Sequence, residues 1–177
     1  FNNNCFINGS NNEIANGVNN ATVLGNFGIA ERDGEVVIGG GGGRNGGKGD
    51  IQSSSFSLYG ITSNAAVTAL FVNDSTTNTI INRSSTSFQG FEANVIGVRT
   101  GGSAGGSVND RIFLRLTGIV YLNVVDQTVA TLGSFGTVTG WTTAIAFDGD
   151  GMTLTITGAA NMSISWSATM NFYEMKI

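Results

Sequence analysis

The sequence predicts an all-β protein, because its patterns favour strands along most of its length and no segment clearly repeats with the period of a helix. Apolar and polar residues alternate along several segments, glycine and asparagine mark the turns between them, and proline is absent beside 27 glycines. Alternation places one side of a strand on a core and the other on solvent or a neighbour. We therefore expect a jelly-roll-like antiparallel β-sandwich head domain over residues 51–177, preceded by a different segment over residues 1–50.

The alternation of apolar and polar residues is clearest within residues 51–177. It covers residues 55–59, 110–116, 152–157 and 162–172. Turn residues recur at intervals of roughly 8 to 15 residues, which suits an antiparallel sandwich. The apolar positions give the predicted core, which consists of Phe56, Leu58, Leu70, Ile112, Leu114, Leu116, Val120, Leu154, Ile156, Ile164, Trp166 and Phe172.

The first fifty residues are rich in Asn and Gly and carry a short repeat. The tripeptide VLG at residues 23–25 returns fourteen residues later as VIG at residues 37–39. An aliphatic pair closed by glycine, recurring at a short period, is typical of a chain that winds into stacked coils. Two such coils cannot bury their apolar side alone, since about three or more repeats are needed. The repeat therefore predicts an intertwined or β-roll neck that meets other chains.

We expect this neck to pack with two further copies of the chain around a three-fold axis, as a homotrimer. A trimer would also cover strand edges that otherwise aggregate. The predicted trimer contacts are Ile7, Val23, Leu24, Val37 and Ile38. The run GGGGGRNGGKGD over residues 39–50 fits a connector or a loop rather than a helix or a strand interior.

Composition excludes several classes of partner. The chain has 8 Lys and Arg against 12 Asp and Glu, a net charge of −4, so it lacks the basic stripe that nucleic acid requires. No apolar stretch approaches the roughly 20 residues of a membrane helix, and we expect no membrane insertion. Cys5 is the single cysteine, which excludes an internal disulfide and a multi-cysteine zinc site. Since the sequence begins at Phe1, we expect a processed product or the ordered C-terminal part of a longer protein.

Three glycine-rich motifs match catalytic or nucleotide-binding signatures without their chemistry. Residues 42–48 fit GxxxxGK, but no Ser or Thr follows the lysine and no helix pattern comes after it. Residues 41–46 fit GxGxxG outside any βαβ unit. Residues 101–105 fit GxSxG, but the chain has no histidine to activate the serine. We therefore expect no cofactor and no enzyme.

Acidic residues leave two alternatives open. Glycoside hydrolysis needs only two carboxylates about 5–9.5 Å apart, so a tailspike-type polysaccharide depolymerase using an Asp/Glu pair remains an alternative function. Glu31, Asp33 and Glu35 lie together near the repeat. Asp148 and Asp150 in the DGDG turn are candidate calcium ligands, because that ion favours hard carboxylates, although a plain hairpin turn explains them as well.

Exposed loops are the expected sites of receptor contact, because binding residues concentrate on loops held by a rigid scaffold. The loops are residues 100–109 and 133–141, and the receptor-contact candidates are Trp141, Ser103 and Asn109. Trp141 follows Thr139-Gly140 and is expected to be partly exposed, whereas Trp166 lies on the apolar side of its strand and belongs to the core. With Trp141 as a stacking platform, a stand-alone carbohydrate-binding module is a further alternative.

Two parts of the chain resemble known assemblies. The run TVLG…VVIG within residues 20–40 is similar to the head repeats of trimeric adhesins and to related β-roll modules of bacteriophage fibres. The motifs TGW, LTITG and ISWSA within residues 139–174 resemble the C-terminal head of phage tail or head fibres. The resemblance implies a virion structural protein, a homotrimer that contacts other virion proteins and attaches to a host cell-surface glycan or protein.

Overall fold

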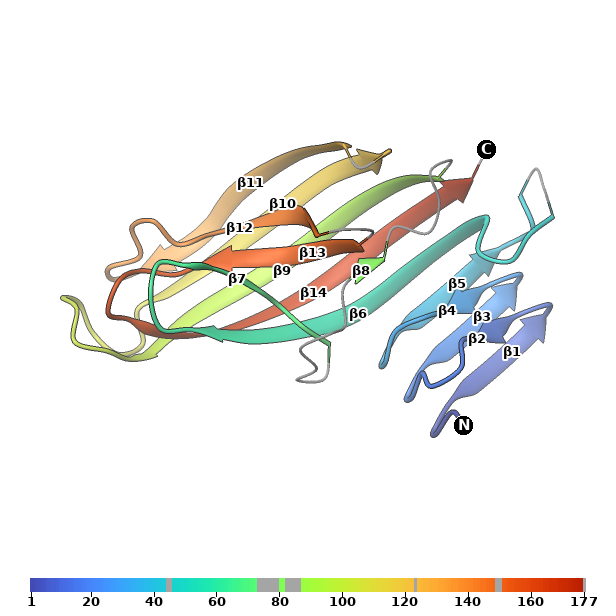
Figure 1. Ribbon diagram of the computed structural model, residues 1–177, viewed down its shortest axis with the longest axis horizontal. Coiled ribbons are helices and arrows are strands. Elements are labelled where there is room, and N and C mark those ends of the chain that lie inside the picture. Colours follow the sequence, from blue (N-terminus) through green and yellow to red (C-terminus); the bar gives the residue numbers. More distant parts are fainter. Residues whose placement is uncertain (44–45, 73–79, 82–86, 123, 149–150, 177) are drawn as a thin grey trace.

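The computed structural model describes residues 1–43, 46–72, 80–81, 87–122, 124–148 and 151–176 of the chain. Every regular element in these ranges is a strand, which confirms the predicted all-β class. No helix in the described ranges is long and apolar enough to span a membrane. The strands form three sheets of eight, four and two strands (Figure 1).

The eight-stranded sheet runs along the whole molecule (Figure 1). Its order is β1-β3-β5-β6-β14-β9-β10-β11, and the strands from β5 onward pair antiparallel. The bounds are β1 Phe6–Ser10, β3 Thr22–Asn26, β5 Val36–Gly40, β6 Ile51–Thr62, β9 Ser87–Gly101, β10 Arg111–Tyr121, β11 Val124–Phe135 and β14 Ser163–Lys176.

A smaller antiparallel sheet covers one side of the large one and makes an unequal sandwich (Figure 1). Its strands are β7 Val67–Ala69, β8 Ile80–Ile81, β12 Thr142–Asp148 and β13 Gly151–Thr157. The core lies between the two sheets. All twelve side chains of the predicted core are at most 5% exposed, so the alternation pattern identified the buried side of each strand correctly.

Residues 6–40, which we call the coil, wind through stacked turns of parallel strand. β1, β3 and β5 pair in register, so that Ile7 lies beside Val23 and Val23 beside Val37. On the opposite side β2 (Glu13–Ile14) pairs in parallel with β4 (Ile29–Ala30). The buried interior consists of Val18, Ala21, Val23, Ala30 and Val37.

The register reveals a third copy of the repeat in β1. Gly9, Gly25 and Gly39 occupy one position in successive turns of the coil. Gly25 has a φ of 86°, and a Cβ there would collide with the carbonyl oxygen of Gly39. Only glycine therefore allows the turns to stack at this position. The first copy escapes a sequence search because Asn8 replaces the second aliphatic residue.

The coil and the sandwich share one continuous sheet, because β5 pairs with β6 across the junction predicted at residue 50. Side chains reinforce this connection. The backbone N–H of Ile29 donates to Oε1 of Gln52 at 3.0 Å, and Nε2 of Gln52 donates to the carbonyl of Ile29 at 3.3 Å. The guanidinium of Arg32 lies 4.9 Å from the ring centre of Phe56 and 5.7 Å from that of Phe172. The coil thus packs directly on the sandwich core.

Candidate interaction surface

One side of the large sheet carries the core, and the other side, which we call the outer face, is not covered by any part of the chain that the structure describes. Because side chains alternate along a strand, every second residue of β6, β14, β9 and β10 points to it, as do the residues of β11 that pair with those of β10. Many of these residues are large and apolar. The exposed apolar side chains of the outer face include Ile51, Tyr59, Ile61, Ile96, Phe113, Ile119, Phe135, Tyr173 and Met175.

The register divides the outer face into layers that run across the strands. We call the end of the sandwich farthest from the coil the tip (Figure 1). Two layers lie nearest the tip. One consists of Ile61, Ser165, Val98, Arg111 and Phe135, and the next consists of Tyr59, Ser167, Ile96, Phe113 and Gly133. Two polar layers follow. The first consists of Ser57, Thr169, Asn94 and Arg115, and the second consists of Ser55, Asn171, Glu92 and Thr117. Two layers lie toward the coil. One consists of Ser53, Tyr173, Gly90 and Ile119, and the other consists of Ile51, Met175 and Phe88.

One ion pair lies in the polar layers. Nη2 of Arg115 donates to Oε1 of Glu92 at 2.9 Å, and Nδ2 of Asn94 donates to the same oxygen at 3.1 Å. The hydrogen bond from Arg115 and then that from Asn94 lower the pKa of Glu92 below its ordinary value. A glycosidase general acid needs a raised pKa, and these hydrogen bonds act in the opposite direction.

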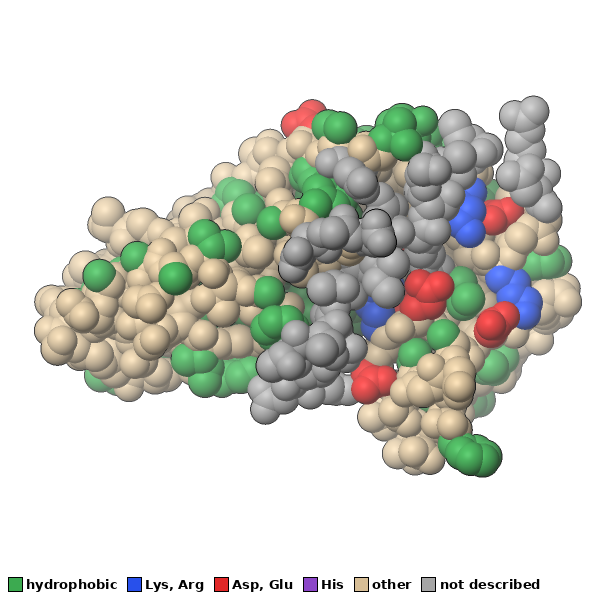
Figure 2. Space-filling view, in the orientation of Figure 1, with side chains coloured by type: hydrophobic (Ala, Val, Ile, Leu, Met, Phe, Trp, Pro, Cys, Tyr) green, Lys and Arg blue, Asp and Glu red, His purple; other side chains and the backbone are tan. Residues whose placement is uncertain are grey.

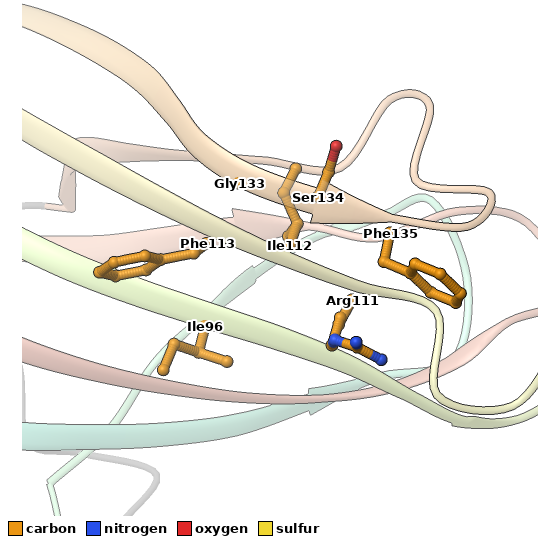
Figure 3. A pocket seen from close by; sticks show the side chains of 7 residues that line it. All are labelled: Ile96, Arg111, Ile112, Phe113, Gly133, Ser134 and Phe135. Atoms are coloured by element: carbon orange, nitrogen blue, oxygen red, sulfur yellow. The ribbon is translucent and has the colours of Figure 1, made fainter.

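A pocket of about 450 Å³ opens in the tip-side layers of the outer face (Figure 3). Its walls come from β9, β10 and β11 and consist of Ile96, Arg111, Ile112, Phe113, Gly133, Ser134 and Phe135. The guanidinium carbon of Arg111 lies 4.6 Å from the ring centre of Phe135. Beside Gly133 the space is open, since a Cβ built there meets no atom within 4 Å. The result is a mainly apolar pocket with one cation and no carboxylate in its walls.

Sequence reasoning missed this pocket. The alternation of residues 110–116 predicts one apolar side, on which Ile112, Leu114 and Leu116 lie. Phe113 lies on the other side, where a solvent-facing strand usually carries a polar residue. That one residue was the available signal, because the remaining walls come from strands that the sequence does not place side by side.

Loops at the tip are held by a buried arginine. Arg99 is 3% exposed, and its guanidinium donates to four carbonyl oxygens at the end of β9 and in the loop that follows it, at 2.7–3.1 Å. These acceptors are Gly101, Gly102, Ala104 and Gly105. The carboxylate of Asp110 lies 3.8 Å from the same guanidinium and accepts the backbone N–H of Ser107 at 2.9 Å. Five donors in a fixed fork suit arginine to this role.

Two further loops pack on the loop that Arg99 and Asp110 hold. Ala104 donates its backbone N–H to the carbonyl of Asn161 at 3.1 Å, which joins the loop before β14. A Cβ on Gly136 would collide with the carboxylate of Asp110, so the loop after β11 approaches this residue closely as well. We call the three segments 102–110, 136–141 and 158–162 the tip loops. On the side of the small sheet, most charged side chains gather toward the coil and leave the tip neutral (Figure 2).

The receptor-contact candidates divide between surface and core. Ser103 and Asn109 are exposed in the tip loops, as expected. The prediction for Trp141 is wrong, because only 4% of this residue is exposed. Gly140, with a φ of 83°, lies in the turn that the backbone N–H of Trp141 closes on the carbonyl of Val138 at 3.2 Å, and the indole packs on Trp166 with ring centres 5.6 Å apart. Trp166 itself is buried, which confirms its assignment to the core.

The predicted trimer contacts also divide. Val23 and Val37 are completely buried inside the coil of a single chain, which corrects the expectation that they face other chains. The two valines occupy matching positions of neighbouring strands inside the coil, where they pack with Val18, Ala21 and Ala30. Leu24 and Ile38 point outward and are exposed, and Ile7 is exposed at the open end of the valine stack. These three remain available for contact.

Acidic residues of the coil have structural roles. Glu35 is completely buried, and its carboxylate accepts the backbone N–H of Glu31 at 2.7 Å and Nη1 of Arg32 at 2.7 Å. Asp33 accepts the backbone N–H of Asn19 at 2.7 Å. These carboxylates therefore fix turns of the coil, which argues against their use as a catalytic pair.

The candidate calcium ligands are beyond what the structure describes. Asp148 ends β12, but its side chain and the whole of Asp150 lie outside the described residues, as do Arg44 and Asn45 of the glycine-rich motif. Among the described residues, no group of three or more His, Cys, Asp or Glu side chains could hold a metal ion.

No protein-family model matches the chain, and no curated protein matches its sequence. Among solved structures, the tailspike protein of Acinetobacter phage vB_ApiP_P1 is similar with a TM-score of 0.32 and 12% identity, over 72% of this chain and 22% of that one. The tailspike protein of Acinetobacter baumannii phage AM24 gives a TM-score of 0.32 and 13% identity, over 86% of this chain and 30% of that one. A structure of Bacillus endospore appendages, described as disulfide-linked pili, gives a TM-score of 0.25 and 12% identity, over 72% of this chain and 93% of that one.

The chain therefore spans less than a third of the length of either tailspike. These similarities are weak. They identify no family.

Proposed function

We propose that the chain is a virion structural protein, a homotrimeric phage fibre or fibre-like decoration that presents the tip loops to a glycan or protein of the host surface. The observation that carries the proposal is the placement of two different surfaces on one rigid sheet. A long apolar face with few charges lies along the side, and neutral loops lie at one end. Large exposed apolar areas are typical of association surfaces, and loops on a rigid β scaffold are typical of recognition.

The tip loops suit recognition because their backbone is already fixed. Arg99 and Asp110 are buried beneath them, while Ser103, Val108 and Asn109 are exposed above. A loop that is ordered before binding loses less conformational entropy when a ligand binds. The neutral polar composition of the chain supports an extracellular location on the virion, where the coil end is free to contact other virion proteins.

The proposal includes no catalysis. No carboxylate lines the pocket of the outer face, and the pKa of Glu92 is lowered rather than raised. A depolymerase would require a carboxyl group with a raised pKa facing a second carboxylate across a sugar-binding cleft.

Light scattering on the purified chain, followed by binding to host cells, tests the proposal. We expect a particle of three 18.3 kDa chains that binds the cells, with binding reduced in a Ser103→Trp variant of unchanged thermal stability, because Ser103 is exposed. A monomer that does not bind cells would contradict the proposal. Release of reducing ends from host capsule would favour the depolymerase, and a monomer that binds glycans would favour a carbohydrate-binding module.

A further inference from the structure

We propose that the pocket of the outer face receives Tyr59 and Ile61 of a second copy of this chain, so that three outer faces pack around one axis. This inference rests on the proposed trimer and specifies its contact. Tyr59 and Ile61 lie on β6 at one margin of the outer face, with 42% and 55% of each residue exposed. The pocket lies between β9, β10 and β11 at the opposite margin.

The register places these side chains at the height of the pocket. Tyr59 belongs to the same layer as Ile96 and Phe113, two of the pocket walls. Ile61 belongs to the layer of Arg111 and Phe135. Rotation about an axis along the strands keeps every layer at its height. Parallel copies around such an axis therefore bring Tyr59 and Ile61 of one chain opposite the pocket of the next.

A contact between two different margins of one face is heterologous, and such contacts close into a ring when the rotation allows it. The same arrangement brings apolar layers onto apolar layers and polar layers onto polar layers. In the polar layers, the ion pair of Arg115 and Glu92 can then be exchanged between neighbouring chains. In the pocket, the hydroxyl of the neighbour's Tyr59 accepts a hydrogen bond from Arg111.

Charge favours a second copy as the occupant. The described residues that point to the outer face carry two cations and two anions, although the whole chain has a net charge of −4. These are Arg111, Arg115, Glu92 and Asp126. Copies that meet through this face therefore avoid the repulsion expected of the chain as a whole. A sugar would instead need several convergent polar groups, and among the pocket residues only Arg111 directs a polar side chain to the outer face, since Ser134 pairs with the inward-facing Ile112 (Figure 3).

The area of the outer face limits how much each of two neighbours can cover. Five strands at a spacing of about 4.8 Å, with about eleven residues rising about 3.3 Å each, present roughly 850 Å². One partner of a standard-size interface contributes about 800 Å². Divided between two neighbours, the face supplies roughly half of that share to each contact, so the trimer depends on all three contacts closing into a ring.

A cysteine pair tests the contact directly. Tyr59 and Gly133 share a layer but lie four strands apart, so about 19 Å separates them within one chain. A disulfide needs Cα atoms within about 7 Å, so any link between these positions joins two chains. In a Cys5→Ser background, the double variant Tyr59→Cys/Gly133→Cys is oxidised with copper phenanthroline and analysed by non-reducing electrophoresis, with Ser57→Cys/Gly133→Cys as the control from a polar layer.

We expect covalent trimers from the first pair and little product from the control. If the wild type is a trimer and the two pairs link equally or not at all, the proposed contact is wrong and the trimer stands. Linked dimers without trimers would exclude the three-fold arrangement. A monomeric wild type would overturn the proposed assembly as well.

A second variant avoids oxidation chemistry. Gly133 has no positive φ and open space beside it, so Gly133→Phe fills the pocket without disturbing the packing of its own chain. We expect this variant to raise the dissociation constant of the trimer by roughly tenfold or more, with Gly133→Ala close to wild type. A Gly133→Phe trimer that dissociates like the wild type would show that no neighbour occupies the pocket.

Discussion

The side chain of Gln127 pairs with the backbone of Ile145 much as a neighbouring strand would. The backbone N–H of Ile145 donates to Oε1 of Gln127 at 2.7 Å, and Nε2 of Gln127 donates to the carbonyl of Ile145 at 3.2 Å. Ile145 lies on β12, the edge of the small sheet, and Gln127 lies on β11, the edge of the large one. One side chain thus closes this side of the sandwich and satisfies two backbone groups of an edge strand.

Replacing Gln127 by leucine should expose this edge. We expect the free energy of unfolding to fall by about 1–3 kcal/mol, because two backbone groups lose their partners. Urea denaturation measures the change. The matched control is Thr128→Ala on the outward side of the same strand, where we expect a change within about 0.5 kcal/mol. Equal effects of the two substitutions would contradict the role of Gln127.

Arg99 should determine the order of the tip loops. In Arg99→Met the carboxylate of Asp110 stays buried without its cation, which costs about 3–5 kcal/mol of stability. We expect loop 102–110 to become sensitive to limited proteolysis while the sheets remain folded by circular dichroism. Lys48→Met is the control, since the pair of Lys48 with Glu13 is largely exposed and we expect it to contribute less than about 1 kcal/mol. Unchanged proteolysis of the loop would exclude Arg99 as its support.

Glycines of the coil should differ in their tolerance of alanine. Gly17 and Gly25 both have a φ of 86°, but only Gly25 approaches another backbone, at Gly39. Gly17→Ala should cost about 1–2 kcal/mol of backbone strain. Gly25→Ala should cost a further ~1–3 kcal/mol because the turns of the coil must separate. Thermal denaturation of the two variants measures the difference, and equal melting temperatures would contradict the stacking at Gly39.

The lowered pKa of Glu92 predicts a direction for the pH dependence of stability. Because the folded-state pKa lies below the unfolded one, the contribution is complete above the ordinary glutamate pKa and disappears as the pH falls through the folded value. The difference in stability between wild type and Glu92→Gln should therefore vanish on acidification. In Arg115→Gln, the titration of Glu92 followed by NMR should move upward. A midpoint that does not move would exclude Arg115 as the cause.

The sequence predicted the core because burial in a strand follows a local pattern. Phe56 and Leu58, or Ile164 and Trp166, alternate with small polar residues within a few positions, and nothing distant is needed to assign their side. Trp141 shows where prediction from the local pattern fails. Its direction depends on the positive φ of Gly140 and on packing against Trp166, and neither can be deduced from the neighbouring letters.

The polar interior was also beyond prediction. Nε2 of Gln52 donates to Glu174 at 2.6 Å across 122 residues of sequence, and both side chains are buried. An isolated glutamate or glutamine in an alternating strand is normally assigned to solvent. The outer face was missed for a related reason, because its layers exist only once β6, β14, β9, β10 and β11 are placed side by side.

The mass of the wild-type chain in solution tests the central claim most directly. Light scattering over a dilution series should give three times 18.3 kDa at the higher concentrations. A particle of 18.3 kDa at every concentration would contradict the assembly, and with it the assignment of the outer face as the surface on which copies of the chain meet.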